Sequence, residues 1–312
     1  MSGFGSGTSK GADAEGAVAA LAGATAALSA ARSTAQARGA QRRAVAARAG
    51  PGRQRVTLLE DETNNTSSAS SSPGSAPQLW ELPCASERDG AEEEVPLSGA
   101  GSLRCGRLVW DAFASPAEAE EVRGAMENGF EGLLHRGVEV SLVPDAAAEA
   151  RMGVVGLTLV EGLVERCRLA LMARLASPGT HLRAVGALLK RVRLPAEEGP
   201  LQSDPGHDPF VPHADRANVA AYEYSALLYL SEAGSDFGGG DLIFLDDDGI
   251  DRVVAPAVGR LVAFSSGLEN LHRAAPVDWG TRYVVGMWFG RSPSMAANHG
   301  RSGSVLEMWA PA

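Results

Sequence analysis

Residues 241–264 have the sequence DLIFLDDDGIDRVVAPAVGRLVAF, in which three short apolar runs are separated by residues that favour turns. The turns are Asp246-Asp-Asp-Gly249 and the pair Val258-Gly259. Each apolar run is much shorter than an ordinary helix, and Gly and Asp between such runs are typical of tight connections between strands. This stretch therefore predicts closely spaced β-strands, as in a β-barrel or β-sandwich.

The same pattern continues outward on both sides, from residue 185 to residue 289. Further short apolar runs lie at Val185–Arg193, Ser225–Leu230 and Arg282–Phe289. Gly238-Gly-Gly240 stands between two predicted strands rather than between a strand and a helix, so it does not indicate a nucleotide-binding loop. Glycines at this place instead permit a tight hairpin.

Two helical segments precede these strands. The first begins at Ser115-Pro-Ala-Glu118, which has the pattern of a capping box with proline at the first helical position. The second spans about Ala146 to Ala176, is rich in Val, Leu and Met, and ends at Ser177-Pro-Gly179. Helices followed by strands predict an α+β fold, in which the helices brace one face of a β core.

The first 78 residues differ in composition from the rest of the chain. Residues 1–59 carry eight basic side chains against two acidic ones, and residues 63–77 are rich in Ser, Asn and Thr. We expect a disordered basic tail, and its Arg-rich part fits either an organellar transit peptide or a plain basic extension of a cytoplasmic protein; an endomembrane location is a further alternative. The expected parts of the chain are the tail (1–78), a strand with supporting helices (79–184), the β core (185–292) and a C-terminal extension (293–312).

The overall composition excludes several classes of protein. The 312 residues are 45% hydrophobic and carry a net charge of −10, which argues against a collagen-like chain, a wholly disordered chain and a protein that grips nucleic acid. No stretch is apolar enough to predict an integral membrane span. The three cysteines include no CxxC pair, which argues against a thiolate zinc site. We expect three free and mostly buried thiols, and a Cys84–Cys105 bridge is the open alternative.

Candidate chemistry is concentrated between residues 213 and 282. His213 and Asp215 stand two positions apart, so in an extended segment both side chains project to the same side. With His272 they supply two imidazoles and one carboxylate, the set that holds one face of a non-haem Fe(II) ion and leaves positions open. Arg282 begins another predicted strand, and a guanidinium inside a barrel needs an anion such as a carboxylate.

The sequence around these residues resembles a known family. The motifs are Pro212-His-Ala-Asp215, Tyr222-Glu-Tyr-Ser-Ala-Leu-Leu-Tyr-Leu-Ser231, Asp236-Phe-Gly-Gly-Gly-Asp-Leu-Ile-Phe244, Glu269-Asn-Leu-His272 and Pro276-Val-Asp-Trp-Gly-Thr-Arg-Tyr283. In this order and spacing they resemble the 2-oxoglutarate and Fe(II)-dependent dioxygenases of the prolyl-hydroxylase type. Within that group the chain is most similar to the prolyl 3-hydroxylase (leprecan) relatives, over about residues 185–290.

The resemblance implies a double-stranded β-helix, or jelly roll, for the β core. It implies that His213, Asp215 and His272 are the iron ligands, and that Arg282 and Tyr229 bind the distal carboxylate of 2-oxoglutarate. The implied cofactors are Fe(II), 2-oxoglutarate and O2, with ascorbate keeping the iron reduced. The implied reaction couples oxidative decarboxylation of 2-oxoglutarate to hydroxylation of a substrate.

The sequence leaves more than one class of substrate open. A prolyl residue of a peptide or protein is the expected target, and a small molecule is the alternative. A polar loop predicted over 195–209 would shape this choice. A non-catalytic metal-binding jelly roll is a further alternative, in which Arg282 would be a surface strand charge and Tyr229 a core aromatic. Four other histidines lack a metal-ligand pattern: His135, His181, His207 and His299.

Overall fold

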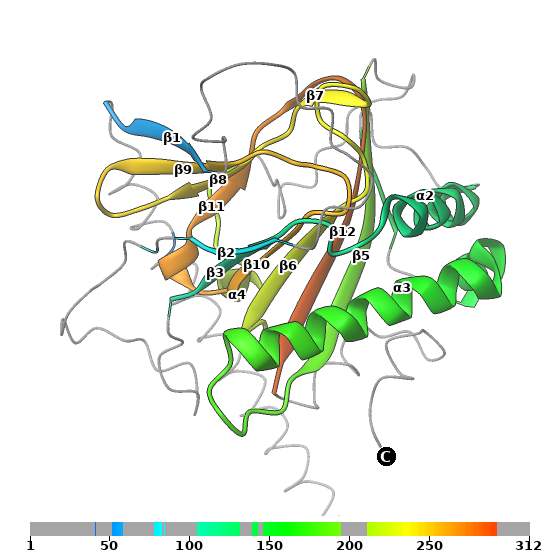
Figure 1. Cartoon of the computed structure of the whole chain (residues 1–312), viewed down its shortest axis with the longest axis horizontal. Coiled ribbons are helices and arrows are strands. Elements are labelled where there is room, and N and C mark those ends of the chain that lie inside the picture. The colour runs from blue at the N-terminus through cyan, green and yellow to red at the C-terminus, as the bar shows by residue number, and fades with distance from the viewer. Residues whose placement is uncertain are drawn as a thin grey trace, which may run out of the picture.

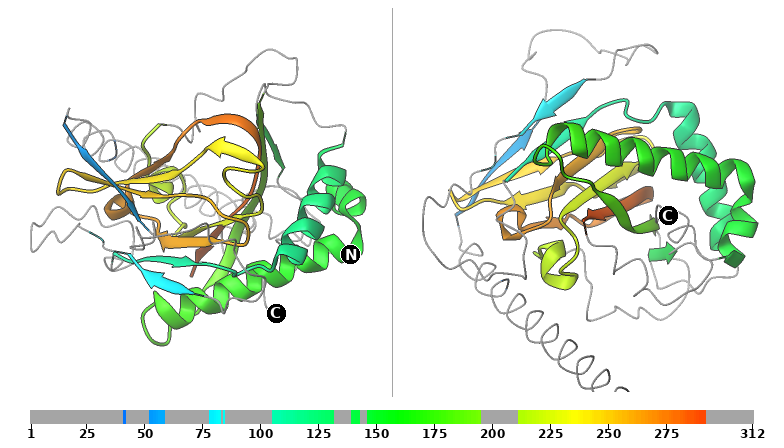
Figure 2. Two further views of the ribbon diagram at one scale, coloured as in Figure 1. Left: turned by 45° about the horizontal axis from the view of Figure 1, so that its top comes forward. Right: turned by 90° about the horizontal axis from the view of Figure 1, so that it is seen from below.

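The computed structural model describes residues 41, 52–58, 78–82, 84, 105–131, 139–142, 146–194 and 211–291. These residues form two β-sheets packed on each other and two long helices that cover the outer face of the larger sheet (Figures 1 and 2). The loop predicted over 195–209, the C-terminal extension, and the histidines at 135, 207 and 299 lie outside the described residues.

The larger sheet has eight strands, and all its pairings are antiparallel. Its order is β2 (Leu79–Glu81), β3 (Arg107–Trp110), β10 (Leu261–Ser265), β6 (Tyr224–Tyr229), β12 (Val277–Gly290), β5 (Arg183–Leu194) and β4 (Glu139–Leu142), and β7 (Phe237–Gly239) also pairs with β12. Four of the predicted strands after residue 185 therefore supply neighbouring or central strands of this sheet, namely β5, β6, β10 and β12.

The smaller sheet has four strands, in the order β1 (Gln54–Leu58), β9 (Ile250–Val254), β8 (Leu242–Leu245) and β11 (His272–Ala274). β8 and β9 form a hairpin whose turn ends at Gly249, a residue with φ of 81° that a side chain would strain. The next strand, β10, belongs to the larger sheet. Residues 241–264 thus cross from one sheet to the other, which is why this stretch decides the architecture.

β1 lies in the segment that we expected to be a tail. It pairs in parallel with β9, from Gln54 opposite Ile250 to Leu58 opposite Val254. Arg53 supports the pairing through an ion pair with Asp251, in which Nε and Oδ1 are 2.5 Å apart. The expectation of a disordered tail is therefore wrong for this strand, because β1 pairs with β9, a strand that would otherwise form the edge of the smaller sheet and that comes much later in the sequence.

The two helices begin and pack as local rules require. α2 (Pro116–Phe130) starts with the predicted capping box: Ser115 Oγ accepts from the Glu118 amide, and the Glu118 carboxylate accepts from the Ser115 amide. α3 (Ala146–Arg174) is interrupted at Gly153, whose φ of 76° is not helical. At Gly156 an added Cβ would lie 2.2 Å from that of Ala125, so glycine permits the close approach of α3 to α2.

Alternate residues of the central strands face opposite layers. One set packs against α2 and α3; in β6 and β12 it comprises Tyr224, Ala226, Leu228, Val285, Met287 and Phe289. The other set meets the smaller sheet in a second core, made by residues such as Tyr229, Val262, Phe264, Leu242, Phe244 and Val254. Helices, larger sheet and smaller sheet form three layers, which confirms the predicted α+β class with a jelly-roll core.

The structure joins Cys84 and Cys105 in a disulfide, with Cα atoms 6.1 Å apart. The expectation of three free thiols is therefore wrong for this pair. The reason is strand register: Glu81 pairs with Leu108, and continuing that antiparallel register brings residue 84 opposite residue 105. Cys167 is free and buried in α3. In the part of the chain that the structure describes, no helix combines the length and apolar content needed to cross a membrane.

Candidate metal centre

Three side chains from separate parts of the fold converge between the two sheets. His213 forms an isolated β-bridge with His272, the first residue of β11, and the two backbones exchange hydrogen bonds of 2.8 and 2.9 Å. Asp215 begins the short helix α4 (Asp215–Asn218), two residues after His213. The bridge therefore brings together residues that are 59 positions apart.

The ligand atoms of these residues lie close together. Those of His213, Asp215 and His272 are all within 4.8 Å of one another, and His213 Nε2 lies 3.5 Å from Asp215 Oδ1. Among the described residues they form the one group of histidine, cysteine or acidic side chains that could hold a metal ion. The three predicted ligands are thus close enough together to hold one metal ion.

Backbone carbonyls fix the orientation of both imidazoles. His213 Nδ1 lies 2.8 Å from the carbonyl oxygen of Val211, and His272 Nδ1 lies 2.9 Å from that of Asn270. A carbonyl only accepts, so in the neutral ring Nδ1 carries the hydrogen. Nε2 then keeps its lone pair for a metal.

Two donors fix the carboxylate. Ser225 Oγ donates to Asp215 Oδ2 over 2.6 Å, and Trp288 Nε1 donates to the same oxygen over 3.0 Å. Asp215 Oδ1 therefore lies toward His213, while Oδ2 accepts hydrogen bonds from one residue of β6 and one of β12. Sequence reasoning missed both donors. The alternation of side chains along a strand could have indicated both donors. Ser225 is four residues before Tyr229 in β6, and Trp288 is six residues after Arg282 in β12, so each donor lies on the same face as a predicted site residue.

The electrostatics of the cluster favour the metal-binding protonation states of two ligands. Burial would raise the pKa of Asp215, but His213, His272 and Ser225 hold it well below its usual range. Burial, with the nearby His213, lowers the pKa of His272 to about 4. Burial also opposes protonation of His213, but the Asp215 carboxylate raises its pKa overall. At neutral pH the carboxylate is ionised and His272 is neutral, as metal coordination requires.

A cavity of about 80 Å³ opens beside the three ligands. Its walls are mainly apolar and include Leu188, Leu227, Leu242, Phe264, Val284 and Trp288. Two cationic residues, Lys190 and Arg282, also line it. Both are buried, so Arg282 is not the surface strand charge that was the alternative. The pocket therefore combines a metal-binding corner, apolar walls and buried positive charge.

The Arg282 guanidinium that lines the pocket is held by the backbone of Gly240. Arg282 Nη1 donates to the Gly240 carbonyl over 2.7 Å, and a Cβ at Gly240 would lie 3.0 Å from the same nitrogen. Gly240 has φ of 76°, so glycine both allows this turn and leaves room for the guanidinium. Tyr229 lines the pocket and also packs in the second core, and burial raises its pKa to about 12. His181 is exposed between α3 and β5, outside the cluster.

Comparison with known proteins identifies the family. Residues 202–290 match the family described as the 2OG-Fe(II) oxygenase superfamily. The Xenopus tropicalis protein named 2-oxoglutarate and iron-dependent oxygenase domain-containing protein 3 is 28% identical over 255 residues, which are 77% of this chain and 78% of that protein. The Homo sapiens protein of the same name is 30% identical over 232 residues, 70% of this chain and 72% of that protein. The chain belongs to the 2OG-Fe(II) oxygenase superfamily.

This membership confirms the resemblance seen in the motifs and gives the reaction class. As a 2OG-Fe(II) oxygenase, the protein is an oxidoreductase whose cofactors are Fe(II), 2-oxoglutarate and O2. A shorter similarity concerns Prolyl 3-hydroxylase 2 of Mus musculus, which is 41% identical over 73 residues, 23% of this chain and 10% of that protein.

Proposed function

We propose that this oxygenase hydroxylates a prolyl residue of a peptide or protein, with His213, Asp215 and His272 as iron ligands. The observation that carries the proposal is the placement of this cluster and of buried Arg282 in one pocket. Arg282 lies buried in the pocket that the three ligands line, and a guanidinium can bind a carboxylate such as that of 2-oxoglutarate through paired hydrogen bonds. A non-catalytic metal-binding module would have no use for such an anion site beside its metal.

The donor set fits iron. Two imidazole Nε2 atoms and one carboxylate oxygen would hold one face of an Fe(II) ion and leave its other positions open, as in the two-histidine, one-carboxylate sites of non-haem Fe(II) oxygenases. When Fe(II) and 2-oxoglutarate are bound, O2 oxidises the keto acid to succinate and CO2 while its second oxygen atom enters a C–H bond of the substrate. The residues around the metal determine which C–H bond is within reach.

The protein's own side chains orient the cosubstrate and exclude water. Arg282, with Tyr229 beside it, would bind the distal carboxylate of 2-oxoglutarate, which directs the keto-acid end toward the ligands. The apolar residues Leu227, Val284 and Trp288 line the space between. Such walls keep water away from the reacting centre.

The prolyl target is supported by the similarity to Prolyl 3-hydroxylase 2. That similarity spans only 73 residues, so it supports the chemistry at the metal more than the choice of peptide. Ascorbate dependence belongs to the same proposal, because an enzyme that decarboxylates 2-oxoglutarate without substrate needs a reductant to restore Fe(II).

The test has two stages. First, metal-free protein is loaded with Fe(II) and assayed for succinate from 2-oxoglutarate, with and without ascorbate. Second, a library of proline-containing peptides is incubated with the loaded enzyme and searched by mass spectrometry for the gain of one oxygen atom. We expect succinate release in the first stage and oxygen insertion at proline in the second.

The His213→Ala variant is the control at both stages, because it removes one proposed ligand and keeps the pocket walls. Wild-type protein that releases no succinate and binds no 2-oxoglutarate would contradict the oxygenase activity. Succinate release without oxygen insertion at proline in any peptide of the library would contradict the prolyl target and leave the proposed iron site intact.

A further inference from the structure

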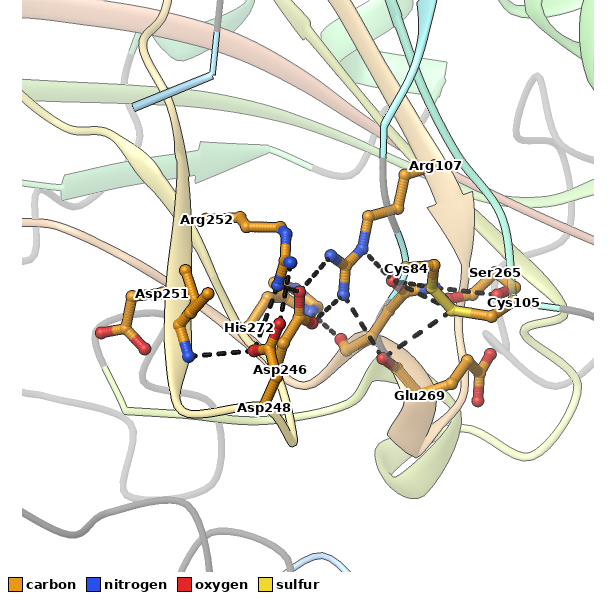
Figure 3. A network of polar contacts seen from close by, with 12 residues as sticks. Cys84, Cys105, Arg107, Asp246, Asp248, Asp251, Arg252, Ser265, Glu269 and His272 are labelled. Atoms are coloured by element: carbon orange, nitrogen blue, oxygen red, sulfur yellow. Dashed lines mark hydrogen bonds and ion pairs between the residues drawn. A yellow bond between two sulfur atoms is a disulfide. The ribbon is translucent and has the colours of Figure 1, made fainter. Parts of the chain in front are cut away.

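A fully buried ion pair lies beside the metal centre, next to His272. The Arg107 guanidinium, from β3, donates to both carboxylate oxygens of Asp246 at the end of β8, over 2.9 and 2.5 Å. Neither side chain is exposed at all. Arg107 also stacks on the ring of Phe244, 4.2 Å from its centroid. Figure 3 shows Arg107 and Arg252 both pointing toward Asp246.

The charges of this group balance internally. Arg252 pairs with Asp246 as well and with Asp248, whose Oδ2 is 2.8 Å from Arg252 Nη2. Two guanidinium groups thus face two carboxylates, so the group does not form an anion or cation site of its own. Because desolvating charge is expensive, such a group adds little net stability, but the loss of one partner would leave an uncompensated buried charge.

The ion-paired guanidinium also holds Asn270. Arg107 Nε donates to Asn270 Oδ1 over 2.5 Å, and Asn270 Nδ2 donates to the carbonyl and hydroxyl oxygens of Ser265, each over 2.8 Å. Asn270 is itself completely buried and ends the 3-10 turn η1 (Leu268–Asn270). Its side chain therefore ties this turn to β3 on one side and to β10 on the other.

Asn270 holds His272 through its backbone. The carbonyl oxygen of Asn270 is the group 2.9 Å from His272 Nδ1. The imidazole also contacts two phenylalanine rings, with centroid distances of 4.8 Å to Phe264 and 6.1 Å to Phe244. A shift of the turn would move the carbonyl, and the ring would lose the contact that aims Nε2 at the metal.

We propose that Arg107 and Asn270 are positioning residues for the iron ligand His272, acting by fixing the carbonyl that accepts from its Nδ1–H. This inference rests on the proposed function, since it takes His272 as a ligand. Neither residue is among those that line the pocket. Both act through the turn that precedes β11, which links β3 to the metal centre.

The test compares Arg107→Lys and Asn270→Ala with a matched control. Arg191 on β5 is also buried, pairs with Glu127 at 2.7 Å, and lies 5.5 Å from the centroid of the Phe130 ring, but on the helix side of the sheet. Arg191→Lys therefore makes the same chemical change in a similar environment away from His272. Lysine keeps the charge beside the carboxylate but lacks the second arm of the guanidinium.

Two measurements distinguish positioning from a general loss of stability. Co(II) affinity is measured by titration, and we expect it to fall about 10- to 100-fold in both test variants, the range found for residues that orient metal ligands. In metal-free protein, long-range proton–nitrogen NMR correlations give the tautomer of His272. We expect Nδ1–H to dominate in the wild type and in Arg191→Lys, and to lose dominance in the test variants.

Co(II) affinity that is unchanged in both test variants, or that falls equally in Arg191→Lys, would overturn the inference. An unchanged His272 tautomer in Asn270→Ala would overturn it as well. Failure of the wild type to bind Co(II) would instead count against the proposed function, and the tautomer comparison would still decide whether Arg107 and Asn270 orient His272. Should Asn270→Ala fail to fold, Arg107→Lys gives both readouts alone.

Discussion

The two faces of the larger sheet carry different kinds of side chain, although the same strands supply both. On the helix side, β6 and β12 present residues that are almost all apolar and pack against α2 and α3. On the side of the smaller sheet, the alternate positions of these strands carry Ser225, Tyr229, Arg282 and Trp288. A strand period of two separates the part of the sheet that stabilises the fold from the part that forms the site.

This difference shows how the fold tolerates a polar pocket. The cost of burying Arg282, and of holding Asp215 against Ser225 and Trp288, is offset by an apolar layer one residue away on β6 and β12. Substitutions on the helix side are therefore expected to change the free energy of unfolding and leave the chemistry alone. Substitutions on the pocket side are expected to change the chemistry more than the free energy of unfolding. Each prediction below tests one side of that division.

Asp215→Ala should have the largest effect. It removes the one carboxylate of the proposed ligand set, so we expect Fe(II)-dependent succinate release to fall below detection. Ser225 and Trp288 would lose their acceptor, which costs about 1–3 kcal/mol of stability, so the variant should still fold. Circular dichroism and thermal unfolding check the fold. Turnover near the wild-type rate would show that the carboxylate is not a ligand.

Leu228→Ala should have the next largest effect, on stability alone. Leu228 is fully buried against the helices, and truncating such a leucine costs about 2–5 kcal/mol. Denaturant unfolding measures the loss, and the half-saturating concentration of 2-oxoglutarate should not change.

The neighbouring Leu227 is the matched control for this change, because it lies on the other face of the same strand and lines the pocket. Leu227→Ala should cost less stability, since Leu227 is only partly buried, and it should alter turnover. The division between the faces fails if Leu228→Ala changes the 2-oxoglutarate requirement more than Leu227→Ala does.

Arg282→Lys should raise the requirement for 2-oxoglutarate. Lysine keeps a positive charge but cannot form the paired hydrogen bonds of a guanidinium with a carboxylate. One hydrogen bond to a charged group is worth about 1.5–3 kcal/mol, so we expect the half-saturating concentration to rise about 10- to 100-fold. Titration with 2-oxoglutarate at fixed Fe(II) measures it, and Co(II) affinity should be unaffected. An unchanged requirement would assign the distal carboxylate to another residue.

The sequence predicted those features that are encoded within a short stretch. Strand runs, the capping box at Ser115 and the spacing of His213 and Asp215 all depend on neighbours a few residues apart. The features that it missed, or named only as an alternative, depend on register between distant strands. The Cys84–Cys105 disulfide follows from the pairing of β2 with β3, and the contact of Arg107 with Asp246 joins residues 139 positions apart. No local pattern specifies which strands become neighbours.

The Arg-rich N-terminal segment shows that a distant strand can also give structure to a segment that its composition predicts to be disordered. Its composition predicted a tail, because a short strand without a partner cannot bury enough surface to be stable. β1 nevertheless pairs with β9, since Gln54 to Leu58 supply backbone groups to an edge that the hairpin leaves open. Composition describes what a segment does alone, whereas this strand is stabilised by residues nearly 200 positions later.

Trp288→Phe should have the smallest effect, and it tests how much a single hydrogen bond to Asp215 contributes to metal binding. Phenylalanine keeps an aromatic ring to stack on Tyr222, whose ring centroid is 5.1 Å from that of Trp288, but it removes the donor to Asp215 Oδ2. Ser225 Oγ still donates to the same oxygen over 2.6 Å, so the carboxylate keeps one of its two supports. We therefore expect metal affinity to fall by no more than about tenfold.

The Co(II) affinities of single and double variants, together with their thermal midpoints, distinguish a lost hydrogen bond from a packing defect. If Trp288 acts through its hydrogen bond, Ser225→Ala should reduce Co(II) affinity to a similar degree, and the double variant should lose more than the two single losses combined, because Asp215 would then have no donor behind it. If Trp288 acts through packing, its loss should lower the thermal midpoint without this coupling. Equal affinities in all variants would mean that backbone placement alone orients Asp215, and the pocket side would then depend on the same strand geometry as the helix side.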